Sequence, residues 1–207
     1  MESREKLIDI IVKAEWEMFQ DVNKGSGMRS FCQEDPKTFE IMRTSQFVSW
    51  SDKMLESYMA DFEDAKLSGR NLLTEKYARM MESTSPLEYA KIKDRLPVLD
   101  PEISILIEKI IKIELVWEEE LAKKFPNITK RGRPIFSSHD SLFSTSKETY
   151  FKGEMATYSQ KTLEYYYKEV IEKKSKNINM SAIVLEAQVK GYGYPSLEKA
   201  EEILSNM

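Results

Sequence analysis

Ionisable side chains interrupt the apolar faces of several helices that the sequence predicts. A helix advances by about 100° per residue, so the spacing between two residues shows whether they share a face. By that measure carboxylates point inward at Glu15 and Glu154, and cations point inward at Arg43 and Lys76. A buried charge is costly unless it is paired or bound to a ligand. We therefore expect these side chains to meet inside the molecule.

One interpretation of this group is an enzyme or binding protein with a buried polar pocket for a small anionic metabolite. Arg43 and Lys76 would hold a carboxylate or phosphate of the ligand, and Gln46 would orient it. Glu15 or Glu154, its pKa raised by an apolar setting, would act as general acid or base. The other interpretation is an internal network of ion pairs that ties the helices together. A ligand site needs a cavity and an entrance, whereas a structural network is closed.

Other side chains could complete such a pocket. Trp50 and Tyr158 would form aromatic walls. Arg29 lies in the glycine-containing loop 25–35, which leads to a helix N-terminus where anions are favoured, although an ordinary turn explains the same residues. For Cys32 in this loop we expect a small buried residue rather than a reactive thiolate.

Composition excludes several classes of site. The chain has 207 residues and a net charge of -4, so no positive field predicts binding to nucleic acid. One Cys and one His exclude a disulfide framework and a multi-histidine metal centre within one chain. We expect no cofactor and no metal site, but Mg²⁺ or Mn²⁺ bound by Glu15, Glu154 or Asp61 is kept as an alternative.

Helical periodicity and capping residues predict the helices that carry these groups. Apolar residues recur at spacings of three and four, and capping residues mark helix starts. The pattern predicts helices at about residues 4–22, 36–50, 52–68, 71–82, 86–96, 101–125, 146–174, 180–190 and 196–205. The predicted fold class is all-α, an irregular multi-helix bundle of about eight or nine helices. We expect a single domain over residues 1–207.

A long loop is predicted at about residues 127–144, and its length suggests a function. It contains Arg131 and Arg133, which together make it locally basic. A phosphate-handling role for this loop and the loop around Arg29 is a third interpretation of the sequence, although exposed arginines are common.

No membrane or targeting segment is visible in the sequence. The most apolar stretch, residues 103–117, is interrupted by charged residues such as Glu108 and Lys112. The charged N-terminus lacks the basic and apolar regions of a signal peptide. We expect a cytoplasmic protein that binds no membrane, and the free Cys32 fits a reducing compartment. A homodimer is compatible with the sequence.

Three sequence blocks resemble an uncharacterised bacterial family catalogued only as a domain of unknown function. They are Glu15-Trp16-Glu17-Met18-Phe19, Cys32-Gln33 to Gln46, and Arg70-Asn71 to Glu82. The resemblance implies a bacterial cytoplasmic protein whose relatives occur beside nucleotidyltransferase-like domains. It brings no known catalytic residues.

This resemblance sharpens an alternative to the metabolite pocket. The protein would be a non-catalytic helical module that binds a protein partner or regulates a nucleotidyltransferase. Such a module predicts a closed interior and an exposed apolar patch, whereas a metabolite site predicts a cavity.

Overall fold

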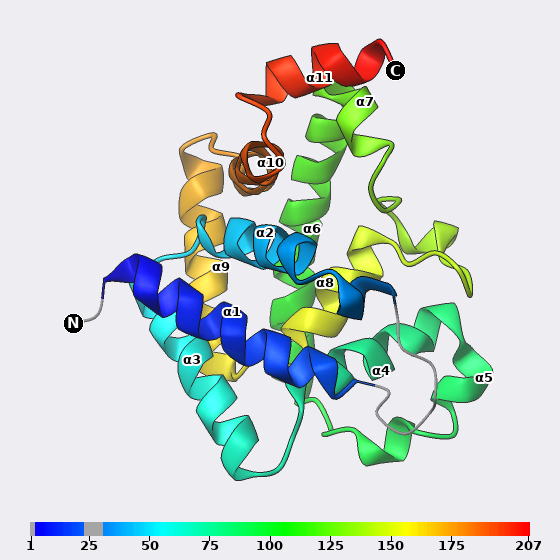
Figure 1. Ribbon diagram of the computed structural model, residues 1–207. Coiled ribbons are helices and arrows are strands. Elements are labelled where there is room, and N and C mark those ends of the chain that lie inside the picture. Colours follow the sequence, from blue (N-terminus) through cyan, green and yellow to red (C-terminus); the bar gives the residue numbers. More distant parts are fainter. Residues whose placement is uncertain (1–2, 23–30) are drawn as a thin grey trace.

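Eleven α-helices make up the computed structural model, which describes residues 3–22 and 31–207 and has no β-strand in those ranges (Figure 1). Nine of them have nine residues or more, which confirms the all-α multi-helix prediction. The helices are α1 (Arg4–Gln20), α2 (Pro36–Phe47), α3 (Asp52–Leu67), α4 (Leu72–Thr84), α5 (Pro86–Tyr89), α6 (Pro101–Lys124), α7 (Pro126–Thr129), α8 (Lys147–Met155), α9 (Gln160–Ser175), α10 (Met180–Gly191) and α11 (Leu197–Ser205). Short 3₁₀ turns lie at Phe31–Glu34, Lys93–Arg95 and Ser137–His139.

Side-chain caps fix where many of the helices begin. At the starts of α2, α3, α4 and α6 a capping side chain accepts a hydrogen bond from a backbone N–H of the first turn; these residues are Asp35, Ser51, Asn71 and Asp100. Ser85 makes no such bond, and α5 ends at Tyr89 instead of near residue 96. The helix predicted at residues 86–96 is therefore much shorter in the structure.

The helix predicted at residues 146–174 is broken into α8 and α9, so the prediction of one continuous helix is wrong. The Thr157 hydroxyl donates to the Glu154 carbonyl at 2.7 Å, within the turn that ends α8. Ser159 then caps α9, and its N–H donates to Asp61 Oδ2 on α3 at 3.0 Å. Local side-chain bonds and a tertiary contact thus outweigh the helical periodicity of this segment.

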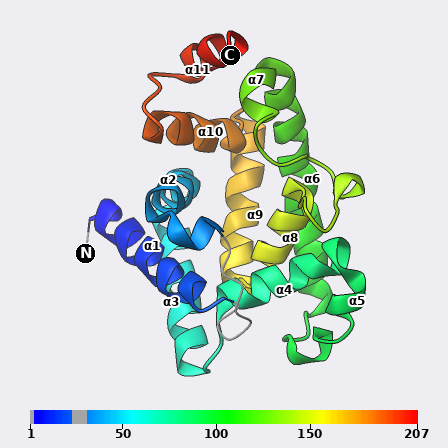
Figure 2. The same cartoon turned by 45° about the vertical axis from the view of Figure 1, so that its right-hand side comes forward.

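The helices pack in layers around α6 and α9, which lie side by side (Figures 1 and 2). The α1 helix packs against α2, α3 and α4, and α8 packs against both α4 and α6. The α10 helix crosses α2 where a Cβ on Gly191 would lie 2.7 Å from Ile41 Cγ2, so glycine permits this close approach. The main core between these helices contains fully buried side chains such as Trp50, Phe47 and Leu163.

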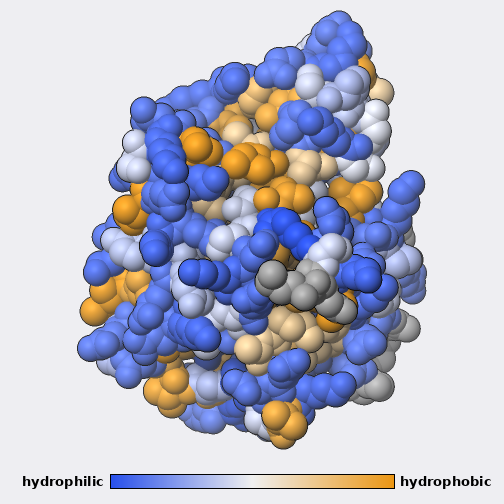
Figure 3. Space-filling model, turned by 90° about the vertical axis from the view of Figure 1, so that its left-hand side faces the viewer, coloured by the Kyte–Doolittle hydropathy of each residue, from blue (hydrophilic) through white to orange (hydrophobic). Residues whose placement is uncertain are grey.

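A second, smaller apolar cluster joins α7, α10 and α11 to the end of α6 through Leu121, Phe125, Val189 and Leu197. The face that carries the N-terminus is mostly hydrophilic, with separate apolar patches (Figure 3). Among the described residues, no helix combines the length and the apolar character that crossing a membrane requires.

Candidate functional site

Arg43 on α2 is the centre of a buried ionic cluster that also contains Glu15 of α1, Lys76 of α4 and Glu154 of α8. Arg43 binds Glu15 with both nitrogens of one guanidinium edge, Nε to Oε2 and Nη2 to Oε1, each at 2.6 Å. The same Nη2 donates to Glu154 Oε1 at 2.6 Å, and Lys76 Nζ donates to Glu154 Oε2 at 2.7 Å. The structure thus joins the four inward charges that helical periodicity picks out.

Tyrosine hydroxyls complete the hydrogen bonding of both carboxylates. Tyr58 donates to Glu15 Oε1 at 2.8 Å, and Tyr158 donates to Glu154 Oε1 at 3.0 Å. Burial raises the pKa of both phenols well above the ordinary value, and the adjacent carboxylates raise it further. Both tyrosines therefore stay protonated and act as donors.

A close approach of two helices makes the Lys76–Glu154 pair. A Cβ on Gly153 of α8 would lie 3.0 Å from the Lys76 carbonyl oxygen and 2.9 Å from Met80 Cγ of α4. Glycine at this position allows the backbones to pack closely. The position of Glu154 therefore depends on the residue that precedes it.

Electrostatics hold Glu154 and Arg43 in their ionised forms. Burial alone would raise the pKa of Glu154, but Arg43 and Lys76 outweigh it and lower that pKa to about 2. Burial alone would lower the pKa of Arg43, but Glu15 and Glu154 raise it well above the ordinary value. The expectation of a raised pKa is therefore wrong for Glu154, because its cationic neighbours stabilise the charge.

The ionic cluster is closed off from solvent. The four side chains are between 0% and 8% exposed, and each charged group faces a partner of opposite charge. Two surface hollows, of about 470 and 260 Å³, are lined by other residues. The cluster has the geometry of an internal network rather than of a cavity with an entrance.

The other residues expected around a pocket occupy different settings. Trp50 is buried against Phe47 and against Tyr58, Tyr158 and Tyr166, and its Nε1 has no hydrogen-bond partner among residues 3–22 and 31–207. It therefore packs in the core instead of lining a cavity.

Gln46 is half-buried, and no hydrogen bond joins its side chain to the ionic cluster in the described part of the chain. Arg29 and most of its loop lie outside the described residues.

Cys32 is exposed, so the expectation of a small buried residue is wrong. The 3₁₀ turn directs its neighbour Gln33 inward instead, where Nε2 donates to the Phe19 carbonyl at 2.6 Å and to the Val22 carbonyl at 3.1 Å. These bonds satisfy carbonyl groups around the end of α1. Sequence periodicity could not reveal this role, because the turn is not part of a regular helix.

Asp61, the third carboxylate considered for a metal ion, accepts the Ser159 N–H at the start of α9. Within residues 3–22 and 31–207, no group of three His, Cys, Asp or Glu side chains has an arrangement that could hold a metal ion.

Glu114 on α6 is a buried carboxyl outside the group of inward charges predicted from the sequence. It accepts a hydrogen bond from the Tyr166 hydroxyl of α9. Burial raises its pKa to about 8; Glu118 and Glu154 add to this increase, and the Tyr166 hydrogen bond opposes it. Glu114 lies three residues after Ile111 and three before Trp117, so helical spacing places it on the apolar face of α6 and could have predicted its burial.

The loop between α7 and α8 is ordered around Asp140. This carboxylate accepts from the Ser83 hydroxyl of α4 and from the Ser146 N–H, each at 2.5 Å, and from the Thr149 hydroxyl. Burial alone would raise the pKa of Asp140, but these hydrogen bonds lower it. The segment is thus fixed to α4 and to the first turn of α8.

The tip of this loop exposes large apolar side chains. Ser141 and Ser144 exchange backbone hydrogen bonds of 2.8 and 3.2 Å, which closes a tight turn. Leu142 and Phe143 between them are 69% and 94% exposed. We call Leu142 and Phe143 the apolar tip.

An aromatic ring links the ionic cluster to the same loop. Lys76 Nζ lies 3.7 Å from the centroid of the Tyr150 ring, and the Arg133 guanidinium carbon lies 4.9 Å from that centroid. Cation–π contacts of this kind are favourable. Tyr150 therefore contacts a cation of the buried cluster and a cation of the surface loop.

The chain matches a family model described as a protein of unknown function (DUF4125) over residues 5–202. This match confirms the resemblance to a domain of unknown function. Comparisons with curated proteins and with solved structures find no match.

Proposed function

The chain belongs to the DUF4125 family, and we propose that it acts as a helical interaction module that binds a protein partner through the apolar tip. The observation that carries this proposal is the exposure of Phe143, 94%, on a loop whose backbone is held in place. Exposed apolar side chains grouped on an ordered surface are typical of interaction sites. A cytoplasmic location, which the sequence favours, is part of the proposal.

The loop presents the apolar tip in a form that favours binding. Asp140 ties the base of the turn to α4 and α8, and Glu148 accepts the Ser137 N–H at 2.8 Å. Less conformational entropy is lost on binding when a segment is already ordered. An aromatic side chain such as Phe143 is also a favourable anchor for an apolar pocket of the partner.

The positive charge of the loop indicates that the partner's apolar pocket has a negatively charged rim. Between residues 130 and 147 the chain has four Lys or Arg residues and one carboxylate, although its overall net charge is -4; the cations are Lys130, Arg131, Arg133 and Lys147. A partner with carboxylates around an apolar pocket would complement this surface. The nucleotidyltransferase-like domains that the sequence resemblance implies as neighbours are the first partners to test.

The ionic cluster has a structural role in this proposal. A ligand anion at Nε or Nη2 of Arg43 would have to displace the carboxylates of Glu15 and Glu154, which already accept from these two nitrogens. Acid–base catalysis by Glu15 and Glu154, with Arg43, Gln46 and Lys76 holding a metabolite, stays a prediction that this geometry does not favour. The cluster instead fixes α1, α2, α4 and α8 relative to one another.

Binding measurements with a tip variant test the proposal. Wild type and the double variant Leu142→Ser/Phe143→Ser are each titrated with nucleotidyltransferase-like domains, and their self-association is measured by sedimentation. We expect the tip variant to bind its partner more weakly by about tenfold or more. The matched control is Val98→Ser, which removes an apolar side chain that is 97% exposed elsewhere.

The outcomes separate the partners. Loss of self-association in the tip variant alone would identify a second copy of the chain as the partner. Equal binding by wild type, the tip variant and Val98→Ser would contradict a role for the tip, as would the absence of both interactions. Thermal unfolding midpoints of the three proteins should agree, because all three side chains are exposed.

A further inference from the structure

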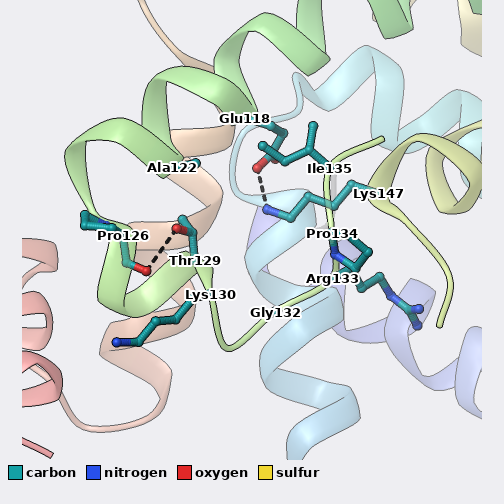
Figure 4. Close-up of a pocket in the computed structure, with 10 residues that line it drawn as sticks. All are labelled: Glu118, Ala122, Pro126, Thr129, Lys130, Gly132, Arg133, Pro134, Ile135 and Lys147. Carbon is teal, nitrogen blue, oxygen red and sulfur yellow. Dashed lines mark hydrogen bonds and ion pairs between the residues drawn. The ribbon is translucent and has the colours of Figure 1, made fainter. Parts of the chain in front are cut away.

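A hollow of about 470 Å³ opens between the end of α6, α7, the following loop and the start of α8 (Figure 4). Glu118 of α6 and Lys147 of α8 form an ion pair inside it. Ala122, Pro126 and Ile135 add apolar walls. Its volume is within the range of about 300 to 1,000 Å³ that is common for small-molecule sites.

The charges around this hollow do not balance. Lys130, Arg133 and Lys147 line it together with one carboxylate, Glu118. Lys147 is paired with Glu118. Lys130 Nζ donates to Asn127 Oδ1 at 2.6 Å, and its charge also acts on the nearby Glu201 carboxylate, whose pKa it lowers. Arg133 is therefore the cation most available to an anion at this site, and Lys130 is shared with Glu201.

Arg133 is held by weak neutral contacts. Its Nη1 donates to the Thr145 carbonyl at 3.1 Å, and its guanidinium carbon lies 4.9 Å from the Tyr150 ring centroid. Figure 4 shows Arg133 and Lys130 on different sides of the hollow, both extending outward from the Glu118–Lys147 pair. Both side chains are long and exposed, so rotation about their bonds can bring them over a ligand.

The backbone of the hollow is already ordered. The Lys147 N–H donates to the Pro134 carbonyl at 2.8 Å, and the Glu148 N–H donates to the Ile135 carbonyl at 3.0 Å. On the other side, the Glu201 carboxylate of α11 accepts the Asn127 N–H at 2.8 Å. Only the two rim cations need to reorganise when a ligand binds, which limits the entropic loss.

We propose that this hollow binds a small amphipathic anion, a carboxylate or phosphate monoester carried on an apolar or aromatic body. The apolar body would lie against Ala122, Pro126 and Ile135. The anionic group would lie at the mouth, where charge-assisted hydrogen bonds from Arg133 and Lys130 replace their neutral contacts. The Glu118–Lys147 pair would accept or donate hydrogen bonds at polar positions of the ligand. Lys130 and Arg133 also belong to the basic rim proposed for the partner, so ligand and partner would share these two cations, whereas the apolar tip is not part of the hollow.

Titrations with three probes test the combination of charge and apolar body. Phenyl phosphate has both, inorganic phosphate has the charge alone, and benzyl alcohol has the ring alone. Ligand-observed NMR gives the Kd of each probe. We expect phenyl phosphate to bind at least tenfold more tightly than either of the others. Benzoate, compared with phenyl phosphate, distinguishes a carboxylate site from a phosphate site.

Charge-matched variants locate the binding. Lys130→Gln/Arg133→Gln should weaken phenyl phosphate binding by about tenfold or more, because two charge-assisted bonds are lost. Lys112→Gln/Lys123→Gln removes the same charge from exposed positions of α6 and should leave the Kd unchanged. Circular dichroism checks that both variants fold.

Two results would overturn the proposal. Either phenyl phosphate binds no more tightly than inorganic phosphate, or the two double variants weaken it equally, which would indicate general attraction to positive charge. The Leu142→Ser/Phe143→Ser variant should retain the site, so a failure of partner binding and a failure of ligand binding are distinguishable.

Discussion

Replacing Glu114 by Gln should remove a large part of the pH dependence of stability. Glu114 is 5% exposed on α6 and accepts the Tyr166 hydroxyl. A neutral carboxyl and a carboxamide have nearly the same shape, and both keep a carbonyl oxygen that accepts this bond. The variant therefore imitates the protonated form of Glu114 at every pH.

The size and sign follow from the pKa of Glu114. Burial raises that pKa from 4.5 to about 8 in the folded chain, so the folded state binds the proton more tightly than the unfolded chain. Its contribution to stability is complete below pH 4.5 and is lost progressively as the pH rises to about 8. At about 1.4 kcal/mol per pKa unit, the loss over this interval is about 5 kcal/mol.

Urea unfolding at intervals from pH 5 to pH 9 measures this loss. We expect the wild type to lose stability relative to Glu114→Gln by up to about 1.4 kcal/mol per pH unit below pH 8, with a constant difference above it. Glu120→Gln, at an exposed position of the same helix, controls for the lost charge. A difference between wild type and Glu114→Gln that does not change with pH would refute the reasoning.

Two further substitutions test the scaffold. Arg43→Met leaves the carboxylates of Glu15 and Glu154 without their shared partner. Urea unfolding should show a free energy of unfolding lower by about 3 to 5 kcal/mol, with a smaller decrease for Arg43→Lys. A decrease below about 1 kcal/mol would contradict a structural role. Gly153→Ala places a Cβ against α4 and should cost about 1 to 3 kcal/mol. Gly132→Ala, whose Cβ would meet only a carbonyl oxygen at 3.5 Å, should stay within about 0.5 kcal/mol, and equal effects of the two alanines would contradict the close approach.

Helical periodicity was sufficient to find the charges that form the ionic cluster. Each of Glu15, Arg43, Lys76 and Glu154 lies in a regular helix, where a spacing of three or four residues determines the face. Capping residues likewise fixed most helix starts, because a cap is a local interaction.

Features that depend on tertiary contacts could not be predicted in this way. The break between α8 and α9 is stabilised by Asp61, which is distant in sequence. Tyr158 lies in that break, yet its hydroxyl still contacts Glu154, as the sequence predicts for a residue beside the inward charges. The walls of the 470 Å³ hollow come from α6, α7, a loop and α8. Because its lining residues are spread over these segments, no local sequence pattern predicts the hollow.

The ionic cluster also constrains the order in which the chain can be assembled during synthesis. Glu154 follows Lys76 by 78 residues and Arg43 by 111 residues. Until α8 has emerged from the ribosome, the earlier helices contain both cations but only Glu15 to neutralise them. Burying an unpaired cation is unfavourable, so closing the N-terminal helices around Lys76 is costly before that point. Glu154 lowers this cost once α8 is complete, which links the folding of α8 to that of the helices before it.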